Sequence, residues 1–231
     1  MRRLILFSCA ALLLSSQGLA GETARESRQI SGVNQVVLRR VGDLILTQSD
    51  RESLVIEAEA RLLPKISTEV RSGVLYLDFN EKQIFSRSPI RFHLNVKNLY
   101  RIQSEGSGNI ASGKLRVGYL EIEIQGSGQA RIESLSAKQL KVRLAGAGDV
   151  RIDGGEVTMQ EVSIEGSGDY AAPQLASTTT TASISGSGSI AIAAQDALAA
   201  KIAGSGEIRY LGNPTLSQSI TGAGRIKRVG S

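Results

Sequence analysis

The chain repeats the tripeptide Gly-Ser-Gly or Gly-Ala-Gly seven times in its second half. The first glycines stand at positions 106, 126, 146, 166, 186, 204 and 222, so the spacing is twenty residues four times and eighteen residues twice. A unit this short cannot bury an apolar face alone, so neighbouring units must stack and share a core. The spacing therefore predicts a tandem repeat architecture.

Each unit places apolar residues at every second position on both sides of the glycine motif. Two places after the motif stand Ile110, Ala130, Val150, Tyr170, Ile190, Ile208 and Ile226. Two places before the next motif stand Ile124, Leu144, Ile164, Ile184, Ile202 and Ile220. A period of two rich in Ile and Val indicates a β-strand with one buried face, whereas a helix has a period of 3.6. Each unit is therefore predicted to hold a strand before the glycines, a strand after them and a variable connection.

Two all-β folds could repeat such units: a meander of hairpins or a parallel β-helix. A meander usually joins its strands with two-residue turns such as Asn-Gly, and no regular turn dipeptide recurs here. A β-helix sets equivalent residues of successive coils above one another, which explains why the glycines recur in register. We therefore expect a parallel β-helix with coils of about twenty residues.

The glycines continue the buried alternation. Stepping by two from Leu120 passes Ile122, Ile124, Gly126 and Gly128. This phase predicts that both glycines of each motif point inward at a sharp corner where only a hydrogen fits. The middle residues are predicted to point outward: Ser107, Ser127, Ala147, Ser167, Ser187, Ser205 and Ala223.

The first half lacks the tripeptide but keeps short strand patterns at residues 44–46, 54–56, 75–79 and 92–96. We expect irregular first coils and a cap, so that residues 30–229 form one β-helix domain. Residues 21–29 are polar and are expected to be disordered.

Residues 1–20 are typical of a secretory signal peptide. Arg2 and Arg3 precede an apolar stretch from Leu4 to Leu14, and Gly18-Leu19-Ala20 is a small-residue cleavage site. Cys9, the only cysteine, lies inside this leader. Its setting faintly resembles a lipoprotein box, but it follows too little apolar sequence, so we expect cleavage and a mature protein without disulfides.

The charge and the aromatic content argue against nucleic acid as a partner. The formal charge of +5 falls to +3 once Arg2 and Arg3 are removed, and the chain has four Phe, five Tyr and no Trp to form a stacking platform. After the leader, no segment has the eighteen or so apolar residues of a membrane-spanning helix.

Several segments together resemble a known family. They are residues 41–46, 70–77 and 89–94, followed by the Gly-Ser-Gly-x-Ile series. This order is similar to that of bacterial exported proteins carrying the domain of unknown function called the autotransporter adhesin head, or GIN domain, over roughly residues 30–229. The resemblance implies a right-handed β-helix and a role in the envelope, in the periplasm or at the surface of a Gram-negative bacterium.

Metal and catalytic sites find little support in the sequence. The residue after the glycine motif is Asp only at Asp149 and Asp169, whereas calcium takes six to eight oxygen ligands. Asp149, Asp153 and Asp169 could approach one another beside Arg131 and Arg151, but a surface ladder of opposite charges is the favoured interpretation. The single His93 is expected on the polar face of its strand. We therefore assign no catalytic, cofactor-binding or metal residue, and no cofactor.

The sequence leaves two functions open. The favoured one is an exported, non-enzymatic module that binds an envelope glycan or another envelope protein, or serves a structural, adhesin-like role. The alternative is a carbohydrate-active enzyme of β-helix type. Three or more carboxylates converging in a groove would favour the enzyme, and isolated ion pairs would favour the module. The sequence does not determine the oligomeric state.

Overall fold

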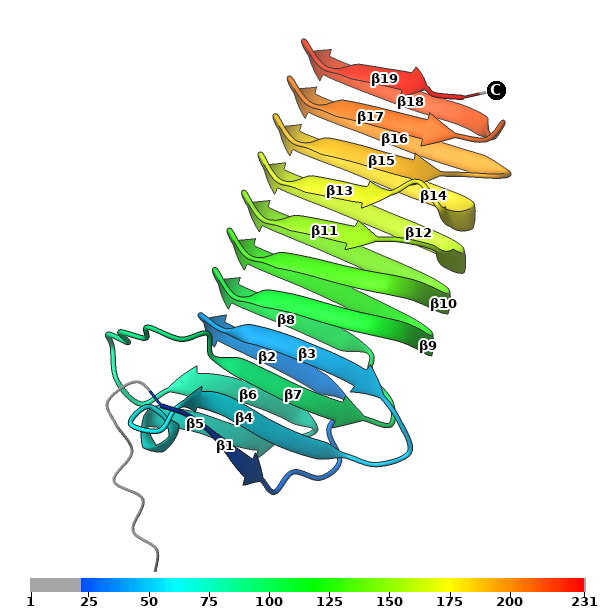
Figure 1. The fold of residues 1–231 in the computed structure, drawn as a ribbon. Coiled ribbons are helices and arrows are strands. Elements are labelled where there is room, and N and C mark those ends of the chain that lie inside the picture. Colours follow the sequence, from blue (N-terminus) through cyan, green and yellow to red (C-terminus); the bar gives the residue numbers. More distant parts are fainter. Residues whose placement is uncertain (1–21, 231) are drawn as a thin grey trace, which may run out of the picture.

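The computed structural model describes residues 22–230, so the signal peptide expected at residues 1–20 lies outside the described residues. Within that range the regular secondary structure is almost entirely β-strand, the exception being one short 3-10 turn, η1, at Leu63–Lys65. Figure 1 shows strands stacked in layers along one axis, with an irregular N-terminal part at one end. No helix of the described chain is long and apolar enough to cross a membrane.

The repeat region is a parallel β-solenoid. Its strands are β8 (Arg101–Gly106), β9 (Asn109–Gly126), β10 (Gln129–Gly146), β11 (Asp149–Ile152), β12 (Gly155–Gly166), β13 (Asp169–Ala172), β14 (Leu175–Gly186), β15 (Ser189–Ala193), β16 (Ala197–Gly204), β17 (Glu207–Leu211), β18 (Thr215–Gly222) and β19 (Arg225–Arg228). Ile110 pairs with Ala130, twenty residues on, and Ile190 pairs with Ile208, eighteen residues on. The parallel pairing confirms the solenoid with coils of about twenty residues and excludes the meander.

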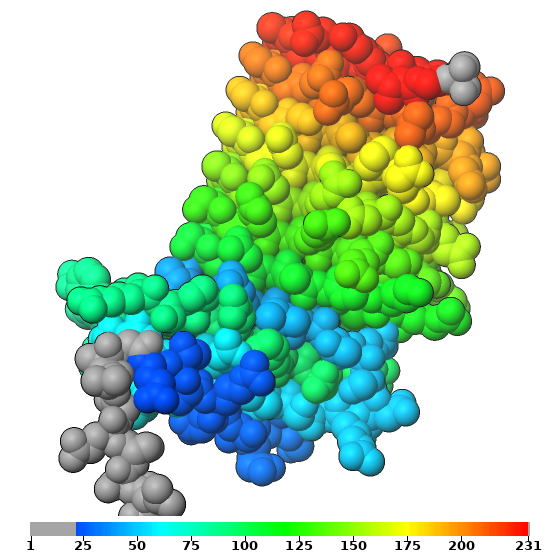
Figure 2. Space-filling view, viewed as in Figure 1, coloured from blue at the N-terminus to red at the C-terminus, as the bar shows by residue number. Residues whose placement is uncertain are grey.

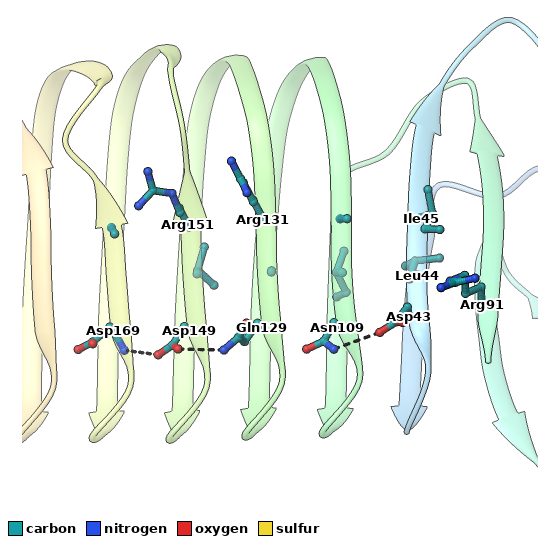
Figure 3. Close-up of a pocket in the computed structure, with 15 residues that line it drawn as sticks. Asp43, Leu44, Ile45, Arg91, Asn109, Gln129, Arg131, Asp149, Arg151 and Asp169 are labelled. Atoms are coloured by element: carbon teal, nitrogen blue, oxygen red, sulfur yellow. Dashed lines mark hydrogen bonds between the residues drawn. The ribbon is translucent and has the colours of Figure 1, made fainter. Parts of the chain in front are cut away.

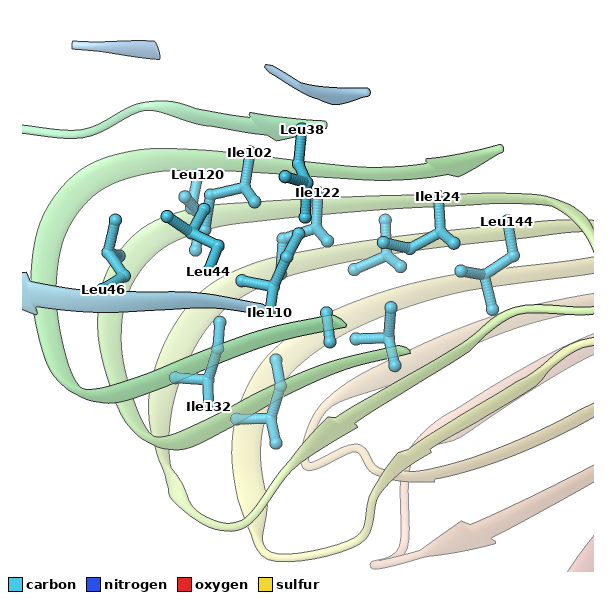
Figure 4. Close-up of a cluster of buried hydrophobic side chains, with 14 of the residues drawn as sticks. Leu38, Leu44, Leu46, Ile102, Ile110, Leu120, Ile122, Ile124, Ile132 and Leu144 are labelled. Carbon is cyan, nitrogen blue, oxygen red and sulfur yellow. The ribbon is translucent and has the colours of Figure 1, made fainter. Parts of the chain in front are cut away.

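Each coil has two strand segments that are joined at one end by a bend. At the other end the glycine motif leads into the next coil. β9 and β10 run unbroken through the bend over 18 residues each, so there the connection between strands is itself strand. In the later coils the bend separates two strands, as between β11 and β12. Inside the coils, the aliphatic residues of successive coils lie above one another (Figure 4).

The glycine motif does form the sharp corner of the coil, but its two glycines differ in a way that the sequence did not predict. The second one, such as Gly128, is buried as expected, whereas Gly126 is exposed. Gly126 is required for another reason: its φ is +122°, and a Cβ would lie 2.4 Å from the carbonyl oxygen of Gly106 in the coil below. Ser127 points outward as predicted, and its amide donates to that same oxygen at 3.0 Å.

The N-terminal part supplies irregular coils and a cap. Its strands are β1 (Thr23–Arg28), β2 (Gln35–Arg40), β3 (Asp43–Gln48), β4 (Ser53–Glu59), β5 (Ile66–Arg71), β6 (Val74–Phe79) and β7 (Arg91–Val96). The β2–β3 coil lies between two other layers, because β2 pairs with β6 and β8 while β3 pairs with β7 and β9, all in parallel. β4, β1 and β5 then add antiparallel to this end. The order of layers therefore differs from the order of the chain.

The expectation of disorder in residues 21–29 was wrong for the part that the structure describes. Residues 23–28 form β1, which pairs antiparallel with the full length of β4. An edge strand is held by backbone hydrogen bonds and needs few apolar side chains. Two polar contacts add to this pairing: Arg25 bonds Glu57 at 2.7 Å, and Arg28 donates to the carbonyl of Leu63 at 3.0 Å.

One continuous core follows the axis from Val33 to Tyr210. The alternation predicted its inward positions: Ile110, Val150 and Ile190 are all buried. The last coil is the exception, because Ile220 is 42% exposed while its counterpart Ile202 is fully buried. No strand of the described residues stacks beyond β18 and β19, so their inward side chains remain partly uncovered.

Candidate binding groove

The strands that follow the glycine motif lie side by side and form one wall of the solenoid. A groove of about 630 Å³ runs along this wall across β3, β9, β10, β11 and β13 (Figure 3). We call it the axial groove. It is lined by Asp43, Leu44, Ile45, Arg91, Asn109, Ile110, Ala111, Gln129, Ala130, Arg131, Asp149, Val150, Arg151, Asp169 and Ala171.

A polar row borders the groove next to the glycine corner. It consists of Asp43, Asn109, Gln129, Asp149 and Asp169, one residue from each of five coils. Asn109 donates to Asp43 at 3.0 Å, and Gln129 reaches Asp149 at 3.4 Å. The row therefore presents carboxylate and amide groups at the repeat of the stack, about 4.8 Å.

A second row, two residues further along each strand, contains both long and small side chains. Arg131 and Arg151 face each other in register, and both bond Asp153, at 2.8 and 2.5 Å. These two guanidinium groups, Arg131 first, lower the pKa of Asp153 below its ordinary value of 3.8. The side chains of Arg131 and Arg151 remain 66% and 62% exposed, so they can still reach a ligand.

Small residues in this second row leave open space on either side of the two arginines. Ala111 lies beside Arg131, and Ala171 lies beyond Arg151. Arg91 borders the groove on β7 and is paired with Glu57 at 2.9 Å. The groove thus has a largely apolar floor, hydrogen-bonding groups along one side and arginines along the other. This arrangement suits an extended ligand rich in hydroxyl groups.

The carboxylates considered in the sequence do not converge. Asp149 accepts from the backbone amide of Asp169 at 3.1 Å, while Asp153 is held by its two arginines. Among residues 22–230, no three His, Cys, Asp or Glu side chains are grouped so that they could hold a metal ion. His93 lies between the buried Phe92 and Leu94 as predicted, with its Nε2 atom 3.7 Å from Glu57.

Cross-coil ion pairs line another wall. Arg143 bonds Glu121 at 2.9 Å, and Lys141 bonds Glu161 at 3.0 Å. These pairs lie before the glycine corner and outside the axial groove.

Sequence reasoning missed the N-terminal side of the groove. Asp43 and Arg91 enter it because the β2–β3 and β6–β7 layers stack below β9. The only available signal was the segment Arg40-Val41-Gly42, which stands in for the glycine tripeptide. Arg40 and Gly42 have φ values of +66° and +120°, and the amide of Ser107 donates to the carbonyl of Arg40 at 2.8 Å.

The comparison with family models decides which family the chain belongs to. Residues 33–214 match the family DUF2807, described as "Putative auto-transporter adhesin, head GIN domain". The chain belongs to the head GIN domain family. The match covers the coils that build the axial groove as well as most of the N-terminal cap, so the resemblance seen in the sequence is confirmed.

Solved structures share the fold of this GIN domain. A protein of Bacteroides fragilis described as a putative adhesin is 26% identical with a TM-score of 0.84, covering 90% of this chain and 97% of its own. A Parabacteroides distasonis protein described as a putative lipid binding protein is 25% identical with a TM-score of 0.75, covering 91% and 98%. A putative adhesin of the same species is 24% identical with a TM-score of 0.75, covering 90% and 98%. No curated protein matches the GIN domain significantly.

Proposed function

We propose that this GIN domain is an exported, non-enzymatic binding module of the bacterial envelope and that its axial groove holds a segment of an extended glycan. The observation that carries the proposal is the continuity of the groove across five coils, with a polar group at each coil along one side. The five residues of that row span four coil steps, or about 19 Å. A polymer fits such an open track better than a small molecule, which proteins usually enclose.

The charges of the groove support a glycan that carries little net charge. Among the residues that line the groove, the three carboxylates of Asp43, Asp149 and Asp169 are matched in number by the three guanidinium groups of Arg91, Arg131 and Arg151. Carboxylates, amides and guanidinium groups all bond hydroxyls, and the apolar floor can take the C–H faces of sugar rings. The adhesin description of the B. fragilis protein agrees with a module that binds rather than cleaves.

The carbohydrate-active enzyme remains the alternative, and the carboxylates argue against it. A general acid needs a raised pKa, whereas Arg131 and Arg151 lower that of Asp153. The carboxylate of Asp149 accepts from the side chain of Gln129 and from the backbone amide of Asp169, so it is engaged along the row rather than across a shared substrate position.

A glycan array probed with the protein tests the proposal. Ala111→Arg places a long side chain in the middle of the groove, in a row where Arg131 and Arg151 show that arginine is tolerated. The matched control is Ala145→Arg, an exposed alanine before the glycine corner and outside the groove. We expect Ala111→Arg to weaken glycan binding at least about tenfold, and Ala145→Arg to leave it unchanged.

Three results would contradict the proposal. Equal binding by both variants would place the ligand elsewhere on the molecule. Shortening of the bound glycans during incubation would favour the enzyme. If an envelope protein is captured and no glycan binds, the ligand class is wrong although the groove could still be the site.

A further inference from the structure

The loop between β6 and β7 carries the most exposed large hydrophobic side chain of the described residues. Phe85 is 74% exposed, and the next such residue, Met159, is 48% exposed. The loop comprises residues 80–90 and stands out from the side of the cap (Figure 1). In Figure 2 the same segment, in blue-green, protrudes from the body of the molecule. It lies outside the axial groove and takes no part in the function proposed above.

The exposure of Phe85 is built into the fold, because the residues around it are tightly held. The carboxylate of Glu59, itself 1% exposed, accepts from the amides of Arg87 and Ser88 and from the hydroxyl of Ser86. Arg61 donates to the carbonyl of Phe85 at 2.8 Å.

The other end of the loop is fixed as well. The side chain of Glu81 bonds Lys65 at 2.9 Å, and its carbonyl accepts from Arg40 at 2.6 Å. A loop anchored at both ends presents its tip in a defined position, so an apolar tip is ready for a partner without further ordering.

Two cations flank the apolar tip. Lys82 and Arg87 stand on either side of Ile84 and Phe85, and neither forms an ion pair with any other described residue. An aromatic ring between cations matches the boundary of an anionic bilayer, where the ring enters the interface and the cations meet phosphate groups.

The N-terminal segment joins the fold beside this loop. The carbonyl of Glu22 accepts from the amide of Ala60 at 3.1 Å, and Ala60 stands between Glu59 and Arg61, which hold the loop. The described chain therefore begins at this face of the cap.

We propose that the loop of residues 80–90 docks on an anionic phospholipid surface, with Phe85 inserted at the interface and Lys82 and Arg87 on the headgroups. A single ring and two cations give weak, reversible attachment, so the contact orients the solenoid on the bilayer rather than anchoring it.

Flotation with lipid vesicles tests this proposal. Protein expressed from the full chain, with its N-terminus defined by mass spectrometry, is mixed with vesicles of phosphatidylglycerol or of phosphatidylcholine. Phe85→Ser is expected to lower binding to the anionic vesicles about tenfold. Lys82→Gln and Arg87→Gln are expected to lower it about fivefold each. Met159→Ser, at the next most exposed hydrophobic position, is the matched control and is expected to change nothing.

Melting temperatures of all four variants should match that of the unmodified protein, because the substituted side chains lie on the surface. The proposal is overturned if the unmodified protein fails to bind anionic vesicles, binds neutral vesicles equally well, or binds as well after Phe85→Ser. Capture of an acidic protein through Phe85, with no vesicle binding, would likewise replace the membrane as the partner.

Discussion

In each glycine motif a side chain is excluded at both glycines, for partly different steric reasons. Gly126 adopts a φ of +122°, which side chains rarely allow, and a Cβ there would meet the carbonyl of Gly106. Gly128 has no such φ, but a Cβ would lie 2.3 Å from the carbonyl oxygen of Gly108. Ser127 between them faces solvent, and its row accepts alanine at positions 147 and 223. The motif is therefore a consequence of close stacking, and its hydroxyl is dispensable.

Replacing Gly126 by alanine tests this account of the motif. Both the positive φ and the backbone contact oppose a Cβ, so we expect a loss of at least about 2 kcal/mol in the free energy of unfolding. For a chain of this size the melting temperature should fall by roughly 4–8 °C. Ser127→Ala is the control and should stay within about 0.5 kcal/mol. A Gly126→Ala protein that melts like the control would refute the steric account.

Among the structural elements, the second half of the loop of residues 80–90 is held by the buried carboxylate of Glu59. The pKa of Glu59 lies below its ordinary value of 4.5 because the carboxylate accepts hydrogen bonds. The largest effect comes from the amide of Arg87, followed by the amide of Ser88 and the side chains of Arg61 and Ser86. A carboxylate with a lowered pKa stabilises the folded form above its ordinary pKa. That contribution disappears as the pH falls through the lowered value.

Hydrogen exchange at the amides of Arg87 and Ser88 measures this anchoring. After correction for intrinsic rates, protection should be constant from neutral pH to about pH 5 and should fall only below 4.5. Glu59→Gln should raise exchange at these two amides about tenfold or more at neutral pH and remove the acid-dependent step. Glu69→Gln, at an exposed carboxylate of the β5–β6 hairpin, serves as the control. Unchanged protection in Glu59→Gln would show that the loop is held by other contacts.

The repeats could be predicted because each element there is dictated by a local pattern. Alternation fixed the inward face of β9 to β17, and the glycine spacing fixed the register between coils. Ile220 departs from the pattern only because no described coil covers it.

The N-terminal elements could not be derived in the same way. Nothing local shows that β3 lies between β7 and β9, or that the polar β1 pairs with the edge of β4. Both depend on contacts between residues distant in sequence, so Asp43 and Arg91 were missed as groove residues. The exposed position of Phe85 depends on Glu59, which lies 26 residues earlier, so it could not be predicted from local sequence either.

For the molecule as a whole, stacking turns a twenty-residue pattern into a long surface. Residues from five coils, from Asp43 to Asp169, contribute one polar group each to a single track. No coil alone contains the axial groove, so its length and its proposed ligand are properties of the entire solenoid. The protruding loop lies apart from that track, which leaves the groove accessible when the cap faces a membrane.

The dependence of binding on ligand length tests the central claim most directly. Oligosaccharides of increasing length, taken from a glycan that binds on the array, are titrated against the protein by calorimetry. We expect affinity to rise with each added sugar until the ligand spans the polar row of about 19 Å, and then to level off. Affinity that is independent of length, or ligands recovered shorter than they were added, would contradict a non-enzymatic axial binding groove.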